Sequence, residues 1–168
     1  DYDDWSALGN PGWGWQDVLP YFRKSETCSD GADEFRGDSG PLYVNNVSAQ
    51  YHPLCNRFIE AGQQQGFNYN PDFNGADQEG VGFYQITTRD GRRMSAARAY
   101  LHPALKRPNC EVLTRAQVTR IVLQGGVAKE VEFIHRGQTR KIRANREIIL
   151  SAGAINSPQL LQLSGIGN

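Results

Sequence analysis

Small and polar residues near the carboxyl end of the sequence have the types and spacing that bring the main chain close to a ligand. The compact apolar run Glu147–Ser151 leads into Ala152 and Gly153, and Ser157 with its following proline comes a few residues later. A strand that ends in small residues lets a ligand approach the backbone, and the helix after it presents free N–H groups. This arrangement can bind a phosphate or a nucleotide ribose. It can equally be a strand–helix connection without a ligand, and these residues alone leave both interpretations open.

The other reactive side chains lack the spacing of a catalytic or metal site. Two histidines directly precede a proline and the third lies in an alternating strand, so we expect structural or surface roles for His52, His102 and His135. The acidic residues of the loop 67–80 fit no ligand loop, and we expect them to be solvated: Asp72, Asp77 and Glu79. The odd, widely spaced cysteines indicate neither a disulfide framework nor a zinc site: Cys28, Cys55 and Cys110. We therefore predict no metal site, and the cysteine pattern favours a reducing compartment.

An aromatic group near the amino end allows two interpretations. Its members are interleaved with Gly and Pro: Trp5, Trp13, Trp15, Tyr21 and Phe22. Such residues can stack on a carbohydrate, but aromatic residues in an irregular segment more often pack that segment onto a core. We predict the packing role.

Length and charge limit the class of protein. The chain has 168 residues, with 18 Lys and Arg balanced by 18 Asp and Glu, which suits one domain with its own core and gives no support to a nucleic-acid partner. No apolar run approaches the ~20 residues that cross a bilayer, and the first residues show no signal-peptide pattern. The start on Asp1, without Met, leads us to expect a piece of a longer protein.

Periodicity predicts a mixed set of elements. Helical spacing predicts helices at 16–24, 53–65, 96–101 (capped by Ser95) and 157–163. Alternation and short apolar runs predict strands at 42–44, 82–88, 111–113, 117–123, 129–135, 141–144 and 147–151. In the predicted strand 82–88, Phe83 and Gln85 share one face and Tyr84 lies on the other.

The fifteen residues from Gly153 to Gly167 carry the most specific pattern in the chain. They run Gly-Ala-Ile-Asn-Ser-Pro-Gln-Leu-Leu-Gln-Leu-Ser-Gly-Ile-Gly. This run resembles, position by position, the second signature of the glucose–methanol–choline (GMC) oxidoreductases. Further blocks resemble the same family: Asp3-x-Trp5, Gly12-Trp13, Val18–Phe22, Ser25-Glu26, Gly40–Leu42, Asp90–Arg93, Ser95-Ala96, Ala99–Leu101, Asn109, Val112–Thr114 and Val118–Ile121. The resemblance covers essentially the whole chain and is strongest for the choline dehydrogenase and bacterial alcohol dehydrogenase branch.

The resemblance implies a fold and a cofactor. The fold is α+β, with an antiparallel substrate-domain sheet, flanking helices and an incomplete part of an FAD-binding, Rossmann-like domain. Residues 1–41 are a linker and helix, 42–108 part of the substrate-binding domain, and 109–168 part of the FAD-binding domain. By this resemblance, Val118 is expected beside the FAD adenine, and the turn with Ala152, Gly153 and Ser157 beside the ribose and pyrophosphate.

The resemblance also places substrate contacts within the chain and the catalytic groups outside it. Phe83 and Gln85, or Tyr84, face the substrate cavity. The fingerprint Gly-x-Gly-x-x-Gly at the start of a helix is absent from the sequence. The family's first signature is expected before Asp1, and its active-site histidine after Asn168. That histidine helps remove the alcohol proton while hydride passes to flavin N5.

We therefore predict a fragment of an FAD-dependent oxidoreductase that oxidises a primary alcohol or choline to the aldehyde, the isolated fragment being inactive. A quinone is the expected electron acceptor, with molecular oxygen as the alternative. The competing hypothesis is a non-catalytic nucleotide-binding or structural module. We expect a cytoplasmic protein, with membrane association of the parent as the alternative, and self-association through exposed apolar surface.

Overall fold

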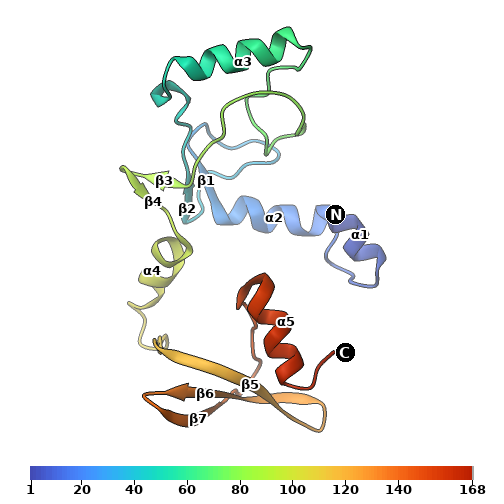
Figure 1. Ribbon diagram of the computed structural model, residues 1–168, viewed down its shortest axis with the longest axis vertical. Coiled ribbons are helices and arrows are strands. Elements are labelled where there is room, and N and C mark those ends of the chain that lie inside the picture. Colours follow the sequence, from blue (N-terminus) through green and yellow to red (C-terminus); the bar gives the residue numbers. More distant parts are fainter. Residues whose placement is uncertain (168) are drawn as a thin grey trace. The chain divides into compact units, whose positions relative to one another are not determined.

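The computed structural model describes residues 1–167 and confirms the predicted α+β class (Figure 1). Two compact units divide the chain, Asp1–Cys110 and Glu111–Asn168. The assignment of residues 1–41, 42–108 and 109–168 to a linker, a substrate domain and an FAD domain stays a prediction. No helix of the described residues is long and apolar enough to cross a bilayer.

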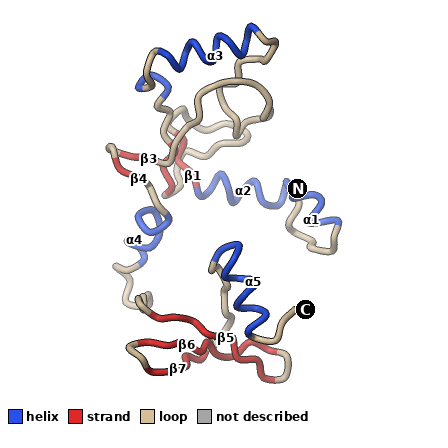
Figure 2. Tube along the Cα trace, in the orientation of Figure 1, coloured by secondary structure: helices blue, strands red, loops and turns tan. Residues whose placement is uncertain are grey.

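The first unit contains short helices and short strands joined by long loops (Figure 2). Its helical elements are α1 (Tyr2–Ala7), α2 (Trp15–Ser25), η1 (Ser48–Gln50), α3 (Leu54–Gln64), η2 (Ala97–Leu101) and α4 (His102–Ala104). Its strands are β1 (Glu26–Cys28), β2 (Leu42–Val44), β3 (Thr88–Arg89) and β4 (Arg92–Arg93). β1 pairs with β2 in parallel, and β3 pairs with β4 antiparallel.

The two longer helices of this unit begin and end where local chemistry requires. At the start of α2, the Asp17 carboxylate accepts a hydrogen bond from the Gly14 N–H at 3.1 Å. Pro53 caps the start of α3, and Gly66, with φ of +94°, follows its end. The predicted helices 16–24 and 53–65 are confirmed to within one residue at each end. The predicted helix 96–101 is present with a π-helical turn, and Ser95 Oγ accepts from the Arg98 N–H at 3.3 Å.

The predicted strand 82–88 is wrong. Only Thr88 and Arg89 form a strand there, and the preceding residues make two isolated bridges, Tyr69 with Val81 and Asn45 with Ile86. A strand needs one continuous neighbour, but successive parts of this segment bond to different parts of the unit. Alternation of residue types therefore did not produce a ladder.

The second unit is an antiparallel sheet with one helix. The strands β5 (Ala116–Gln124), β6 (Val127–His135) and β7 (Gln138–Arg143) follow in order, and α5 (Gly153–Leu163) comes last. Gly125 and Gly126, with φ of +58° and +78°, form the tight turn between β5 and β6. The predicted strands 117–123, 129–135 and 141–144 are confirmed, with β7 beginning three residues earlier.

Three other predictions for this unit need correction. Residues 111–113 and 147–151 are not strands, and α5 begins at Gly153 rather than Ser157. Within the described chain neither segment is hydrogen-bonded to a strand, so neither forms part of a ladder. The apolar run 148–150 belongs to no helix or sheet.

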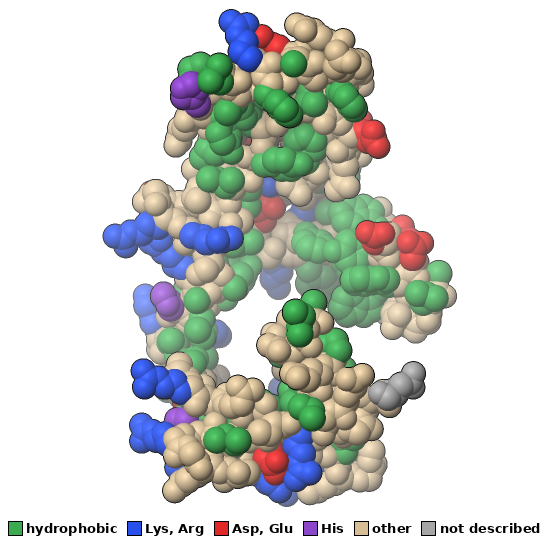
Figure 3. Space-filling view, viewed as in Figure 1, with side chains coloured by type: hydrophobic (Ala, Val, Ile, Leu, Met, Phe, Trp, Pro, Cys, Tyr) green, Lys and Arg blue, Asp and Glu red, His purple; other side chains and the backbone are tan. Residues whose placement is uncertain are grey.

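The core of each unit is small. Only seven apolar side chains are buried among the described residues: Cys28, Val47, Ile59, Ala99, Ile121, Phe133 and Leu160. The amino-terminal aromatic residues contact one another around Tyr2, which lies 5.3 Å from Trp5 and 5.7 Å from Phe22 between ring centroids. Trp13 and Tyr21 nevertheless stay 53% and 71% exposed. Figure 3 shows apolar surface over α1 and α2. The rings pack on each other rather than into a core.

Candidate functional site

An apolar groove in the second unit collects part of the predicted cofactor site. Its volume is about 370 Å³. It lies between the sheet, the segment before α5, and α5 itself. Its lining residues are Val118, Ile121, Val131, Ile148, Ile149, Leu150, Ser151, Ala152 and Leu160. Two predicted cofactor residues, Val118 on β5 and Ala152 before α5, therefore face one cavity although 33 residues separate them by number.

The start of α5 lies at the edge of this groove and holds the other two predicted cofactor residues. Gly153 has φ of +93°, a left-handed conformation that side chains disfavour, and it begins the helix. No described side chain caps the first turn of α5, so its N–H groups remain available. Ser157 Oγ accepts from the Ala152 N–H at 3.1 Å, which holds the turn that precedes the helix. The helix start thus offers donors to an anion or a hydroxyl group.

Ser164 joins two elements around the groove, and the sequence did not single it out. Its Oγ accepts from the backbone N–H of Ile121 on β5 at 2.8 Å and donates to the Leu160 carbonyl at 2.6 Å. Ser164 therefore joins the end of α5 to the middle of β5, a strand that lines the groove. The only sequence signal was its membership of the fifteen-residue run.

The sheet carries charged side chains on the face opposite the groove. Glu132 lies between Val131, which lines the groove, and the buried Phe133, so alternation turns its side chain to the other face. Its carboxylate binds Arg120 at 3.0 Å and Lys141 at 3.6 Å. The hydrogen bond from Arg120, with further help from nearby positive charge, lowers the pKa of Glu132 below its ordinary value. These pairs tie β5, β6 and β7 together.

The predicted substrate residues lie in the first unit, around two cavities. One of about 260 Å³ is mainly polar and is lined by Asp30, Asp33, Asn46, Ser48, Tyr69, Pro71, Asp72, Phe83 and Gln85. The other, about 250 Å³, is mainly aromatic and is lined by Tyr51, Cys55, Phe58, Ile59, Gly82, Phe83 and Tyr84. Phe83 lines both cavities, Gln85 only the polar one, and Tyr84 only the aromatic one.

Two stacked ring pairs shape the aromatic cavity. Tyr51 stacks on Phe83 with centroids 4.9 Å apart, and Phe73 stacks on Tyr84 at 4.7 Å. Tyr51 Oη also donates to the Tyr84 carbonyl at 3.3 Å. Tyr51 and Phe73 were not predicted, because nothing in their local sequence indicates these partners.

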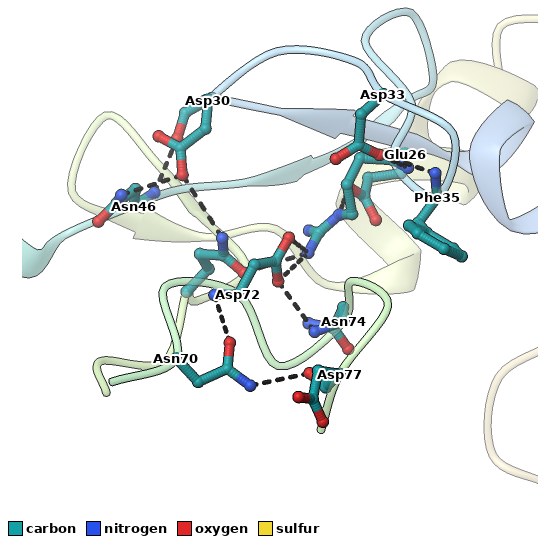
Figure 4. Close-up of polar contacts among 12 residues, drawn as sticks. Glu26, Asp30, Asp33, Phe35, Asn46, Asn70, Asp72, Asn74 and Asp77 are labelled. Carbon is teal, nitrogen blue, oxygen red and sulfur yellow. Dashed lines mark hydrogen bonds and ion pairs between the residues drawn. The ribbon is translucent and has the colours of Figure 1, made fainter. Parts of the chain in front are cut away.

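Gln85 is held by a buried arginine. Arg36 Nη1 donates to Gln85 Oε1 at 3.2 Å and to both Asp72 oxygens at 2.8 and 2.9 Å, while its Nε donates to Glu26 at 2.7 Å. Figure 4 shows Asp72 and Glu26 converging on this group. Burial lowers the pKa of the guanidinium, but the hydrogen bond and charge of Glu26 and the charge of Asp72 outweigh it and raise that pKa. The prediction of a solvated Asp72 is therefore wrong.

The histidines occupy structural or peripheral positions. His52 Nδ1 accepts from the Leu54 N–H at 3.2 Å at the start of α3, and His102 is exposed on α4. His135 ends β6, with a buried Nδ1 that bonds to none of the described residues. None of them lines the groove or the two cavities described above.

The arrangement of elements and motifs has a counterpart among known families. The sequence profile of the GMC oxidoreductases matches residues 1–168. The chain belongs to the GMC oxidoreductase family. The family predicted from the Gly153–Gly167 run is thus confirmed.

Relatives of this GMC chain are named choline dehydrogenases. The oxygen-dependent choline dehydrogenase of Sinorhizobium medicae is 50% identical over 99% of the chain, and the mitochondrial choline dehydrogenase of Mus musculus is 46% identical over 100%. These matches span 30% and 28% of the two relatives. The chain therefore corresponds to less than a third of each protein.

Solved structures agree with this assignment. Pyridoxine 4-oxidase from Mesorbium loti shares 35% identity and a TM-score of 0.87 over 98% of the chain and 33% of its own length. An FAD-dependent oxidoreductase from Chaetomium thermophilum shares 32% identity and a TM-score of 0.87 over 98% of the chain and 31% of its own length. The GMC chain thus matches about a third of each of these two structures, one of which is an FAD-dependent oxidoreductase.

Proposed function

We propose that the full-length protein containing this chain oxidises a primary alcohol or choline to the aldehyde by hydride transfer to FAD. The observation that carries the proposal is the family match over all 168 residues, together with two choline dehydrogenases at 46–50% identity. The chain supplies one side of the cofactor site and part of the substrate wall. By itself it is expected to show no turnover.

The groove of the second unit fits part of the cofactor. An apolar cavity of about 370 Å³ suits a flat adenine ring, and Val118 presents strand backbone to it. The uncapped start of α5 suits the ribose and pyrophosphate, which Ala152 and Gly153 let approach closely because they are small. Ser157 holds this turn through its bond to the Ala152 N–H. When bound, FAD supplies the hydride acceptor at flavin N5.

The aromatic residues of the first unit form the proposed contact with the substrate. Phe83 is half-buried and stacked on Tyr51, while Tyr84 is 66% exposed and stacked on Phe73, so both rings are presented on a fixed support. Gln85 is part of the same segment, but its amide oxygen is occupied by Arg36. Phe83 and Tyr84 therefore bind the body of the alcohol, and Gln85 acts behind them.

The proton acceptor is proposed to lie in the remainder of the full-length protein. The groups that most often act as general bases are histidines, and those of the described chain line none of the three cavities. A quinone is the proposed electron acceptor, and molecular oxygen is the alternative, which the name of the Sinorhizobium relative favours. A cytoplasmic location, with membrane association as the alternative, and self-association remain proposals.

The first test is the visible absorption spectrum of the purified full-length protein. Flavin bands are expected, and they should bleach when choline or a primary alcohol is added without oxygen. Flavin bands that no alcohol bleaches would contradict the substrate class. A colourless protein that binds no added FAD would refute the enzyme and leave the nucleotide-binding or structural module.

A further inference from the structure

Arg36 joins three separate segments of the first unit. Its side chain is 3% exposed, and its guanidinium binds Glu26 on β1, Asp72 in the loop after α3, and Gln85 beside the substrate-facing rings. The two carboxylates are 19% and 24% exposed, so the ion pairs are largely shielded from water. A buried arginine with planar, directional donors fixes the relative position of the groups that it binds.

Arg36 is itself held rigidly. Asp33 Oδ1 accepts from the backbone N–H groups of Arg36 and Phe35, both at 2.7 Å. The Arg36 carbonyl accepts from Arg23 Nε at 3.4 Å. The Cys28 N–H also donates to the carbonyl of the neighbouring Gly37 at 2.7 Å. The backbone that carries the Arg36 side chain therefore cannot shift without breaking several hydrogen bonds.

Asp72 links Arg36 to the loop 67–82 and so helps to hold that loop in place. Asn70, only 6% exposed, accepts from the Asp72 N–H and donates to the carbonyl of Asp77, which closes the loop on itself (Figure 4). Asp72 Oδ1 also accepts from the Asn74 N–H at 2.9 Å. The next residue along the chain, Phe73, stacks on Tyr84. The ion pair with Arg36 thereby sets the position of one substrate-facing ring.

Gln85 receives the same constraint directly. Its amide oxygen accepts from Arg36, and its amide nitrogen donates to Asp30 at 3.4 Å. Asp30 is bound in turn by Asn46 at 2.9 Å. The main chain of residues 83–85 is therefore held from both ends of the Gln85 amide, without the support of a strand.

We propose that Arg36 is a positioning residue that holds Phe83 and Tyr84 in place for the alcohol, through Asp72 and Gln85. This rests on the proposed function, since it takes these rings to be the substrate wall. Arg36 lines neither the groove nor the two cavities described above, so we expect it to affect binding of the alcohol through these rings and not the chemical step.

The test compares two Arg→Lys variants of the full-length protein. Arg36→Lys keeps the charge but cannot bind Glu26, Asp72 and Gln85 together. Arg57→Lys is the matched control, because Arg57, whose side chain is 76% exposed, pairs with Glu60 on α3 and takes no part in this network. In Arg36→Lys we expect KM for the alcohol to rise about tenfold, the size of a lost charge-assisted hydrogen bond, with kcat and flavin content nearly unchanged. Arg57→Lys should match the wild type.

Hydrogen exchange supplies a readout that does not depend on activity. In Arg36→Lys, amides of residues 67–86 should exchange faster, while those of α3 and of the second unit should not. Unchanged exchange of residues 67–86 would overturn the positioning role, whatever the values of KM and kcat. Faster exchange with an unchanged KM, or with a fall in kcat alone, would overturn the proposed effect of Arg36 on binding of the alcohol. Neither result would contradict the proposed oxidoreductase function. A wild-type flavin that no alcohol reduces refutes the proposed function instead, and the exchange data still decide the role of Arg36.

A double-mutant cycle with Phe83→Leu separates positioning from general destabilisation. If Arg36 acts through the ring, the effects of Arg36→Lys and Phe83→Leu on KM should be less than additive, because the second change removes the group that the first displaces. Additive effects would show that Arg36 acts elsewhere and would overturn the proposal.

Discussion

Replacement of Ser164 by alanine should loosen α5 from the sheet that forms the cofactor groove. Ser164→Ala leaves the Ile121 N–H without its acceptor, and Ile121 is only 7% exposed. An unsatisfied buried donor costs about 1–3 kcal/mol, and since Ser164 is itself half-buried and admits some water, we expect about 2 kcal/mol. The bond from Ser164 to the Leu160 carbonyl is lost as well, but that carbonyl lies in a helix with its own hydrogen bonds.

Hydrogen exchange of the two elements measures this cost. Because about 1.4 kcal/mol corresponds to a factor of ten, exchange of amides in β5 and α5 should accelerate about 30-fold in Ser164→Ala. All three tryptophans of the chain lie in residues 1–110, so their fluorescence reports only the first unit and should not change. The effect is thus expected in one unit alone.

Ser157→Ala is the matched control for this prediction. It also removes a hydroxyl that accepts a backbone N–H, that of Ala152, but Ala152 is exposed and water replaces the bond. We expect an acceleration of about twofold or less. Ser164→Thr keeps the hydroxyl and should restore most of the protection. Equal exchange in Ser164→Ala and Ser157→Ala would refute the reasoning, because burial of the orphaned N–H is its only basis.

Three further predictions concern other parts of the chain. Arg120 holds the pKa of Glu132 below its ordinary 4.5, so the pair should stabilise the sheet above pH 4.5 and lose that contribution as the pH falls further. In Glu132→Gln, the thermal midpoint should therefore depend less on pH in the acid range. Gly153→Ala places a side chain at φ of +93°, which costs about 1–2 kcal/mol at the helix start, and flavin absorbance per protein should fall. Burial raises the pKa of the Cys28 thiol, so Ellman's reagent should modify Cys28 more slowly than the other two cysteines in the native protein.

Each of these predictions has an outcome that contradicts it. A pH profile of Glu132→Gln that parallels the wild type would show that Arg120 contributes nothing to the sheet. Full flavin content in Gly153→Ala would mean that the turn relaxes without affecting the cofactor. Peptide mapping that finds Cys28 labelled first would contradict its burial.

Local pattern was sufficient where an element depends on its own neighbours in sequence. The hairpin strands β5 and β6 were predicted because alternation and the Gly125-Gly126 turn act over a few residues, and α3 was predicted from its proline start and glycine stop. The segments 82–88 and 147–151 show comparable patterns but are not strands. Their hydrogen bonds depend on a continuous neighbour, and a sequence pattern does not reveal whether one is present.

The same distinction separates the two halves of the candidate site. The turn around Gly153 was recognised because its small residues and the helix after them are contiguous in the sequence. Arg36 was not recognised, because its three partners lie 10, 36 and 49 residues away in the sequence. The residues that flank Arg36 indicate only a turn. The acidic residue Asp72 looked solvated for the same reason.

The sequence by itself determined the family, the α+β class and the position of the glycine turn, because these depend on contiguous residues whose types are dictated by backbone conformation. Only the tertiary structure decided that Asp72 and Gln85 meet one buried arginine, that Phe83 lies between a polar and an aromatic cavity, and that Ser164 bonds to β5. Each of these contacts joins residues far apart in the chain. Their burial, and hence their energetic weight, exists only once the chain has folded.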